Sequence, residues 1–351
     1  MALLALAPDR DPAAEIAYAA APPEQDHPVE LVEGIWWLRT RLPFALDHIN
    51  IWLLDDGDSW TVIDTGYGDE ATRALWDRML AGPLAGKPVA RVLVTHFHPD
   101  HLGCAGHLCA RTGAPLLMSR TEWLMGRMLS LDDSGLFVAA GERFDRRAGL
   151  PEEIVGQRRE RGNLYRRGVR DVPAPMQRLR AGSEIVAAGS RWRVIIGEGH
   201  APEQVTLFCE ERNILIGADQ ILPRITPVVG VWPMTPENDP LGDFVTSLGR
   251  FVLLPEDCLV LPSHERPYYG LRPRIADLRR HHEERLGRTL ELCGEPATAL
   301  EVTKGLFTRP LDLQQLGFAI AEGLAHLHAL VHQGRVERWT AEDGADRFRT
   351  L

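Results

Sequence analysis

The sequence predicts an α/β domain followed by a smaller helical domain. Its 351 residues exceed the length of one typical domain. Five short apolar runs each end at or shortly before a polar side chain capable of chemistry, and continuous runs of this length are typical of buried strands. The runs are residues 60–63 before Asp64, 92–95 before His96, 192–196 before His200, 214–218 before Asp219 and 259–261 before His264.

The region before these runs is predicted to hold a loose arm and a β-hairpin. Residues 1–27 are rich in Ala, Pro and acidic side chains without a clear period, which is typical of a loosely held arm. Residues 35–38 and 48–54 are β-rich, and Asp55-Asp56-Gly57-Asp58 is typical of a hairpin turn before Trp60. We therefore expect the main domain to span residues 28–272.

The polar ends of the five runs are expected to meet at one sheet edge. Loops at the C-terminal ends of buried strands are where functional sites assemble. Asp64 and Asp219 each lie close to a glycine, so either aspartate could instead be a simple turn residue.

A long helical insert is predicted between the second and third runs, over residues 120–180. Its segment 157–170 is rich in arginine although the whole chain is acidic. An insert beside a site can act as a lid, and its arginines could attract an anionic substrate group. The alternative, which the pattern favours, is a solvated helix face.

The chain after residue 273 is predicted to be a winged-helix-like domain, 273–351. Apolar residues recur at helical spacing, and Thr298 and Glu301 have the spacing of a capping box. Residues 336–339 and 347–349 then indicate a two-stranded wing. The third helix presents His326, His328 and His332 rather than Lys or Arg, so we expect packing or homodimer formation rather than DNA binding. We interpret these histidines, with His281 and His282, as solvated helix residues rather than a second metal site.

Composition argues against several classes of partner. The formal net charge of −10 argues against a nucleic acid or an anionic membrane surface as a partner. No apolar run approaches the roughly 20 residues that span a bilayer, and Met1 to Leu6 is too short for a signal peptide. The five scattered cysteines resemble reduced core residues. We therefore expect a cytoplasmic protein with a small-molecule substrate.

The segment His96-Phe97-His98-Pro99-Asp100-His101 predicts a metal site. Imidazole and carboxylate are the ligands that zinc takes at catalytic sites. His96 and His98 are two apart, so at a strand end their side chains point the same way and can bind one ion. Asp100 and His101 begin the next turn and can face a second ion. A bridging carboxylate would then be needed, and Asp219 is the natural candidate.

Five signatures in order make the chain resemble the metallo-β-lactamase-fold hydrolases, the superfamily that includes glyoxalase II-like thioesterases. They are the Asp64-Thr65-Gly66 strand end, the H-x-H-x-D-H cluster, Gly199-His200-Ala201-Pro202, Gly217-Ala218-Asp219 and Pro262-Ser263-His264. The resemblance covers about residues 30–270 and implies a four-layer αββα sandwich. The chain from about Pro273 also resembles the winged-helix-like C-terminal extension of one branch.

The resemblance implies a ligand for each position of a two-zinc centre. His96, His98 and His200 would bind the first ion, Asp100, His101 and His264 the second, and Asp219 would bridge them. Asp64 would orient a ligand rather than bind metal. Iron or manganese could replace zinc.

The mechanism that follows is hydrolysis of an activated carbonyl group, such as a thioester or lactone. Two zinc ions would supply a hydroxide near neutral pH and polarise the carbonyl oxygen. Asp100 would also move a proton to the leaving group. We expect Arg224, Trp232 and Tyr268 to contact the substrate, which could carry an anionic group, although Trp232 could instead be core and Arg224 a structural ion pair. We expect Glu203 to cap a turn.

Two other functions use the same fold. The basic insert favours a phosphodiesterase or nuclease, whereas the negative net charge of the whole chain argues against one. An iron-bound redox protein is less favoured, because the flavodiiron members replace a cluster histidine with a carboxylate and carry a flavodoxin-like domain, neither of which occurs here.

Overall fold

Two seven-stranded sheets face each other in the computed structural model, which describes residues 16–44 and 46–351. One sheet has the order β2-β3-β4-β5-β6-β7-β8, with bounds Val29–Val32, Ile35–Arg41, His48–Asp55, Trp60–Ile63, Val89–Leu93, Leu116–Ser119 and Gln177–Leu179. The other has the order β1-β14-β13-β12-β11-β10-β9, with bounds Ala17–Tyr18, Tyr268–Tyr269, Leu259–Pro262, Ile214–Ala218, Gln204–Cys209, Ser190–Gly197 and Glu184–Ala187.

The helices fall into three groups along the chain. Those that follow strands of the first sheet are α1 (Glu70–Ala81), α2 (Pro99–Leu102) and α3 (Ala105–Thr112). The insert holds α4 (Arg120–Leu131), α5 (Gly135–Arg147), α6 (Glu152–Arg161) and α7 (Tyr165–Gly168). Then come α8 (Pro240–Leu248), α9 (Leu271–Leu292), α10 (Ala299–Leu306) and α11 (Leu313–His332), before the hairpin of β15 (Val336–Thr340) and β16 (Asp346–Thr350).

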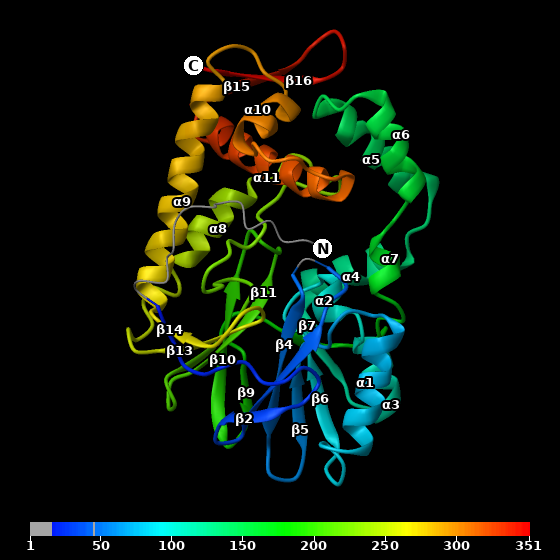
Figure 1. Ribbon diagram of the computed structural model, residues 1–351, viewed down its shortest axis with the longest axis vertical. Coiled ribbons are helices and arrows are strands. Elements are labelled where there is room, and N and C mark those ends of the chain that lie inside the picture. The colour runs from blue at the N-terminus through cyan, green and yellow to red at the C-terminus, as the bar shows by residue number, and fades with distance from the viewer. Residues whose placement is uncertain (1–15, 45) are drawn as a thin grey trace.

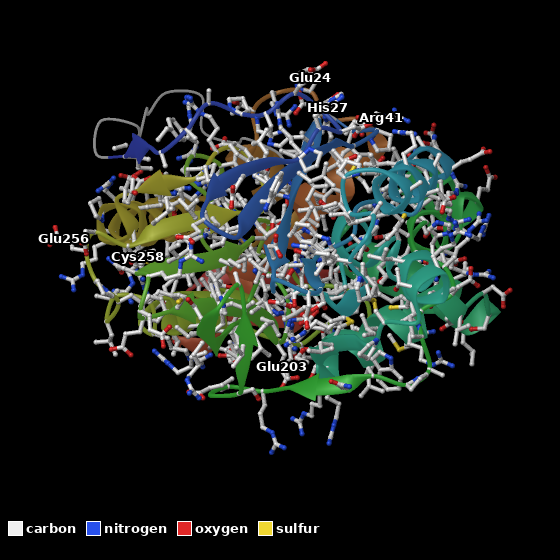
Figure 2. All side chains as sticks on the ribbon, turned by 90° about the horizontal axis from the view of Figure 1, so that it is seen from below. Glu24, His27, Arg41, Glu203, Glu256 and Cys258 are labelled. Carbon is white, nitrogen blue, oxygen red and sulfur yellow. The ribbon has the colours of Figure 1, made fainter. Side chains whose placement is uncertain are left out.

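Successive side chains along each strand point to opposite faces of the sheet, and this alternation builds the four layers. In β4, Ile51 and Leu53 pack with Trp76 of α1, whereas Trp52 and Leu54 pack into the core between the two sheets. Trp52 stacks there on Trp37, with ring centroids 5.8 Å apart. Side chains fill the interior of the molecule (Figure 2). The predicted αββα arrangement is therefore confirmed, because each sheet buries one face against its partner and the other against helices.

The predicted hairpin and the predicted meeting of strand ends had different outcomes. Strands β4 and β5 pair antiparallel around the turn, as expected. The prediction of one sheet edge was wrong, because β5 and β6 belong to one sheet and β10, β12 and β13 to the other. The polar ends meet instead at the rim of the sandwich, where both sheets end together.

The N-terminal arm and the insert differ from their predicted extents. Strand β1 pairs with β14, so the described part of the arm is held at a sheet edge. Residues 1–15 of the predicted arm lie outside the described residues. The insert helices end at Gly168, and the chain then returns to the first sheet as β8.

The C-terminal region contains three helices and a hairpin in the predicted order. The capping box of Thr298 and Glu301 begins α10, and a second box of Asp312 and Gln315 begins α11. Helices α9 and α11 share one hydrophobic core with α8 and the second sheet, so this region packs on the main domain. In Figure 1, α11 lies between α9 and the insert helices α5 and α6. No helix of the described chain is long and apolar enough to cross a bilayer.

The histidines of this region are more buried than we expected. His282, His326 and His328 are buried rather than solvated, because their faces of α9 and α11 pack inward, whereas His332 is exposed. His282 Nδ1 lies 3.4 Å from His326 Nε2, and Nδ1 of His326 bonds to the Glu322 carbonyl. Among the described residues, this cluster is not one of the groups with metal-binding spacing.

Candidate metal centre

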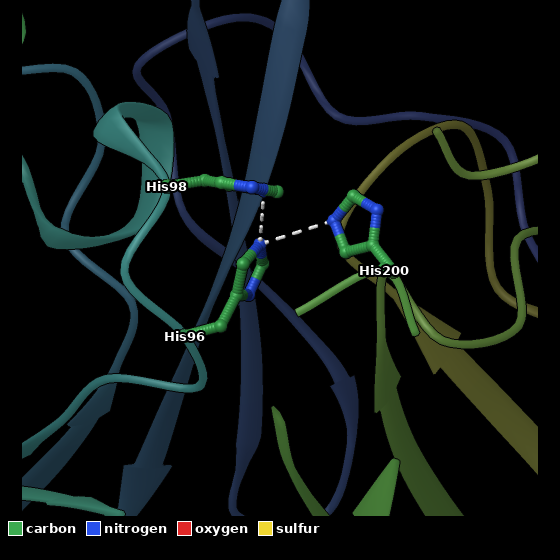
Figure 3. A group of neighbouring side chains, drawn as sticks. All are labelled: His96, His98 and His200. Atoms are coloured by element: carbon green, nitrogen blue, oxygen red, sulfur yellow. Dashed lines mark hydrogen bonds between the residues drawn. The ribbon is translucent and has the colours of Figure 1, made fainter. Parts of the chain in front are cut away.

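Three imidazoles meet where β6 and β10 end. The loop after β6 carries His96 and His98, and the loop after β10 carries His200. The Nε2 atom of His96 lies 3.0 Å from Nδ1 of His98 and 3.3 Å from Nε2 of His200 (Figure 3). All three side chains are at least nine-tenths buried. The three ring nitrogens therefore point at one small volume, which suits a single ion.

A second group lies beside the first. Helix α2 carries Asp100 and His101, and His264 follows β13. Oδ2 of Asp100 lies 3.7 Å from Nε2 of His101 and 3.5 Å from Nε2 of His264. Together the three side chains have the spacing of metal ligands.

Asp219 lies between the two groups. Its Oδ2 atom is 3.4 Å from Nε2 of both His200 and His264, and its Oδ1 atom is 3.5 Å from Nε2 of His101. One carboxylate thus faces imidazoles of both groups. This is the position that a bridging ligand would take.

Hydrogen bonds on the outer side of the rings aim the inner nitrogens. Nδ1 of His200 bonds to the Val228 carbonyl at 2.8 Å, and Nδ1 of His264 bonds to the His48 carbonyl at 2.9 Å. A carbonyl only accepts, so each Nδ1 must carry the proton. The Nε2 lone pairs then face the centre, as metal ligation requires.

The donor set fits a metal ion. Nε2 of His101, Nε2 of His264 and Oδ1 of Asp219 are buried without a hydrogen-bond partner. Leaving such atoms unpaired would cost about 1–3 kcal/mol each. They face one another, so a cation between them would satisfy all three.

The pKa values of these side chains are shifted because the groups are buried and lie close together. Burial and the neighbouring imidazoles lower the pKa of His96 and His98 well below the usual value, which keeps them neutral. Burial also acts to lower the pKa of His101, but the carboxylates of Asp64 and Asp219 raise it well above the usual value. Burial acts to raise the pKa of Asp219, but His264 and His101 hold it well below the usual range. The carboxylates thus favour a protonated His101, and the neighbouring imidazoles favour an ionised Asp219.

Asp64 stands behind this centre rather than in it. It follows β5 with a φ of 63°, a left-handed conformation that a non-glycine residue rarely adopts. Its Oδ1 accepts from the Thr95 amide at 2.8 Å, and its Oδ2 contacts Nδ1 of His101 at 2.9 Å. The carboxylate therefore connects the end of β5 to the loop that carries His96 and His98, which we call the metal loop, and it orients His101.

Asp64→Asn is expected to weaken metal binding by roughly 10- to 100-fold, as is usual when the partner of a ligating imidazole is changed. The amide can still accept one hydrogen bond, but it cannot stabilise the His101 ring by charge. Metal affinity measured by competition with a coloured chelator tests this. Asp77→Asn, at a half-exposed aspartate that contacts His107 far from the centre, is the matched control. Unchanged affinity in Asp64→Asn would refute the orienting role.

A buried glutamate that sequence reasoning missed joins two of the metal loops. Glu122, in the first turn of α4, is fully buried. Its Oε2 accepts from the Phe97 amide at 2.9 Å, and its Oε1 accepts from the Glu203 amide at 2.6 Å. Burial raises the pKa of Glu122 to about 7, against the effect of these two amides. The side chain of Glu203, labelled in Figure 2, accepts from the Thr121 amide at 3.0 Å in the first turn of α4. It therefore supports a helix whose N-cap is Ser119, rather than capping a turn as predicted.

A cavity of about 590 Å³ opens onto the centre at His98 and Asp100. Its walls come from parts of the chain that are distant in sequence: the loop after β6, the insert, α11, the segment 232–234, and the side chains of Phe44 and Tyr67. Trp232, one of the predicted substrate contacts, lines the cavity and forms an edge-on pair with Phe318 of α11, with ring centroids 5.7 Å apart. Phe137 of α5 adds to the apolar wall.

The structure places two predicted substrate contacts elsewhere. Tyr268 is fully buried and donates to the Ile221 carbonyl, so its side chain is part of the core. Arg224 is exposed and does not line the cavity, because the loop that carries it folds against α9. There the guanidinium of Arg274 donates to the carbonyls of Leu222 and Arg224. The structure therefore places neither side chain at the cavity.

Fold and centre together define a metal-dependent hydrolase. The chain belongs to the metallo-beta-lactamase superfamily, whose family model matches residues 45–264. A second model, the metallo-beta-lactamase-like C-terminal domain, matches residues 286–351.

Similar proteins span nearly the whole chain. A crystal structure of a beta-lactamase domain protein from Burkholderia ambifaria is 38% identical, with a TM-score of 0.89, and the match covers 97% of this chain and 99% of that one. A metallo-beta-lactamase family protein from Thermus thermophilus is 32% identical, with a TM-score of 0.77 and coverage of 92% and 100%. A probable metallo-hydrolase, YqjP of Bacillus subtilis, is 26% identical over 312 residues, covering 85% of this chain and 92% of the relative.

Proposed function

We propose that this protein is a dinuclear zinc hydrolase that opens an activated carbonyl bond of the thioester or lactone type. The observation that carries the proposal is Asp219, whose buried carboxylate faces two separate ligand groups at once. When bound, two zinc ions would lower the pKa of a shared water and polarise the substrate carbonyl.

The protein's own side chains would supply the remaining functions. Asp100 lines the cavity and is positioned to pass a proton between the attacking water and the leaving group. Tyr165 of the insert donates its hydroxyl to the Phe97 carbonyl and so holds the metal loop in place. Trp232 and Phe318 form an apolar wall that would bind an acyl group and exclude water.

Two relatives with named activities inform the choice of bond. A hydroxyacylglutathione hydrolase of Pseudomonas entomophila is 31% identical over 115 residues, which is 33% of this chain and 42% of that protein. A linear primary-alkylsulfatase of a Pseudomonas species is 21% identical, and the match covers 43% of its length. The first supports thioester hydrolysis; the second matches at lower identity and acts on another class of ester.

A substrate panel on the zinc-loaded protein tests the proposal. We expect turnover of a chromogenic thioester or lactone, with little activity on a β-lactam or on bis(p-nitrophenyl) phosphate, and close to two zinc ions per chain. His98→Ala should lose at least about a hundredfold in kcat/KM, whereas His332→Ala, at an exposed histidine outside the centre, should match the wild type. Fewer than one bound ion without chelator, or preferential phosphodiester turnover, would overturn the proposal.

A further inference from the structure

We propose that the substrate carries phosphate groups on its leaving group, and that they bind in a second groove, lined by arginines, that adjoins the cavity of the metal centre. This inference rests on the proposed function, because it names the substrate class of the same site. The groove has a volume of about 790 Å³. It includes the guanidinium groups of Arg127, Arg166, Arg167 and Arg170, together with the carboxylate of Asp171.

The groove and the cavity are neighbours. Asn163 and Arg167 line both. The Asn163 side chain donates to the carbonyls of Leu129 and Asp132 at 2.7 and 2.8 Å, which fixes the loop between α6 and α7. Arg167, one turn further on, is exposed at the junction. A ligand that extends from the metal centre past Arg167 therefore enters the groove.

The arginines of this region fall into two sets. Arg158 lies 2.7 Å from Asp145, Arg159 lies 3.8 Å from Glu142, and Arg166 lies 3.1 Å from Asp133, so these three are neutralised locally.

The second set, Arg161, Arg167 and Arg170, has no such neighbour. Within residues 16–44 and 46–351, no carboxylate oxygen comes within 4.0 Å of their guanidinium nitrogens, although the chain carries ten more acidic than basic side chains. All three are exposed; Arg167 and Arg170 line the groove, whereas Arg161 lines only the cavity. Unpaired guanidinium groups gathered beside a cavity form a site for a multiply charged anion.

The cavity and the arginine-lined groove would bind different halves of the substrate. The cavity wall of Phe137, Trp232 and Phe318 suits an apolar acyl group, and Asp100 and His98 stand where the carbonyl would react. The phosphates must then lie on the other side of the scissile bond. A thioester of a phosphorylated thiol meets both requirements. Its hydrolysis adds water oxygen to the acyl carbon, breaks the carbon–sulfur bond and returns one proton to sulfur, so that a carboxylic acid and a thiol form.

A small phosphorylated molecule is favoured over a nucleic acid. The overall charge of −10 repels a long polyanion, and Arg161, Arg167 and Arg170 lie within one short segment of the chain. Helix α11 also lines the cavity above the centre with Leu313, Gly317 and Phe318, so it restricts the space available to a duplex or strand.

The test compares two thioesters that share an acyl group. One is butanoyl-coenzyme A, and the other is the butanoyl thioester of N-acetylcysteamine, which lacks the phosphates. We expect the wild type to favour the first by at least about tenfold in kcat/KM, through a lower KM. Arg167→Ala/Arg170→Ala should abolish this preference, through a higher KM for butanoyl-coenzyme A. Arg178→Ala, at an exposed arginine of β8 that lines neither space, should retain the preference.

A binding measurement separates this inference from the proposed function. Adenosine 3′,5′-bisphosphate carries two of the three phosphate groups of coenzyme A and no thioester, so its calorimetric affinity does not depend on hydrolysis. We expect salt-sensitive binding to the wild type that falls at least about tenfold in the double variant. If neither thioester is hydrolysed but this binding pattern holds, only the proposed function fails. Equal affinity in wild type and double variant, no preference between the thioesters, or tighter binding of a single-stranded RNA oligonucleotide would overturn the phosphate groove.

Discussion

Asp219→Ala is expected to lower kcat/KM by at least about a thousandfold, since Lewis-acid catalysis contributes several kcal/mol and each 1.4 kcal/mol is a factor of ten. The reason is geometric. Asp219 is the carboxylate that faces His101, His200 and His264 together, at 3.4–3.5 Å. Without it, both ligand groups lose a partner, and the buried imidazoles keep their mutual repulsion. We therefore expect the bound metal to fall in the same variant.

The measurements are kcat/KM on the best substrate of the panel and metal content after gel filtration. Asp219→Asn is the informative companion, because it keeps the side-chain volume and removes the charge. Asp58→Ala, in the exposed turn between β4 and β5, controls for the loss of an aspartate elsewhere. Circular dichroism should show the same fold in all variants. If Asp219→Ala keeps its metal and its activity within tenfold, Asp219 is not the bridging ligand.

Glu122→Ala is expected to reduce the free energy of unfolding by about 2–6 kcal/mol, since it leaves two buried amides unsatisfied at about 1–3 kcal/mol each. Those amides belong to Phe97 and Glu203, which lie beside the metal ligands His96, His98 and His200. Loosening both loops should also weaken metal binding. Unlike Asp219, Glu122 does not face the centre, so its effect on catalysis should follow from its effect on stability and metal binding.

Urea unfolding of the metal-free and zinc-loaded protein measures this effect. Glu122→Gln should cost less than Glu122→Ala, because its carbonyl oxygen can still accept from one of the two amides. Glu160→Ala, at an exposed glutamate of α6, should change the free energy of unfolding by less than about 0.5 kcal/mol. A cost below 1 kcal/mol for Glu122→Ala would show that the two loops are held by other contacts.

The candidate metal ligands could be predicted from the sequence because residue types that bind metals cluster in short motifs. His96, His98, Asp100 and His101 lie within six residues, and few other uses suit such a cluster. His200, Asp219 and His264 each follow an apolar run, and the structure brings all seven side chains together. The resemblance to a known superfamily added the order of these segments.

The substrate contacts could not be predicted in this way. Tyr268 and Arg224 follow the metal-ligand segments closely in sequence, yet one is buried in the core and the other lies against α9. Proximity along the chain does not fix direction, because the packing of a loop depends on residues far away. Arg274, which holds the Arg224 loop, is 50 residues further along the chain.

The sequence by itself determined an α/β domain, the helical C-terminal region and the set of candidate ligands, because periodicity and ligand motifs are local properties. The αββα class was implied by the resemblance to a known superfamily. Only the tertiary structure decided that the strand ends come from two sheets, and that Glu122 joins two metal loops. It also decided that the insert and α11 wall one cavity, with unpaired arginines beside it. These features depend on contacts between segments up to about two hundred residues apart, and no local pattern encodes such contacts.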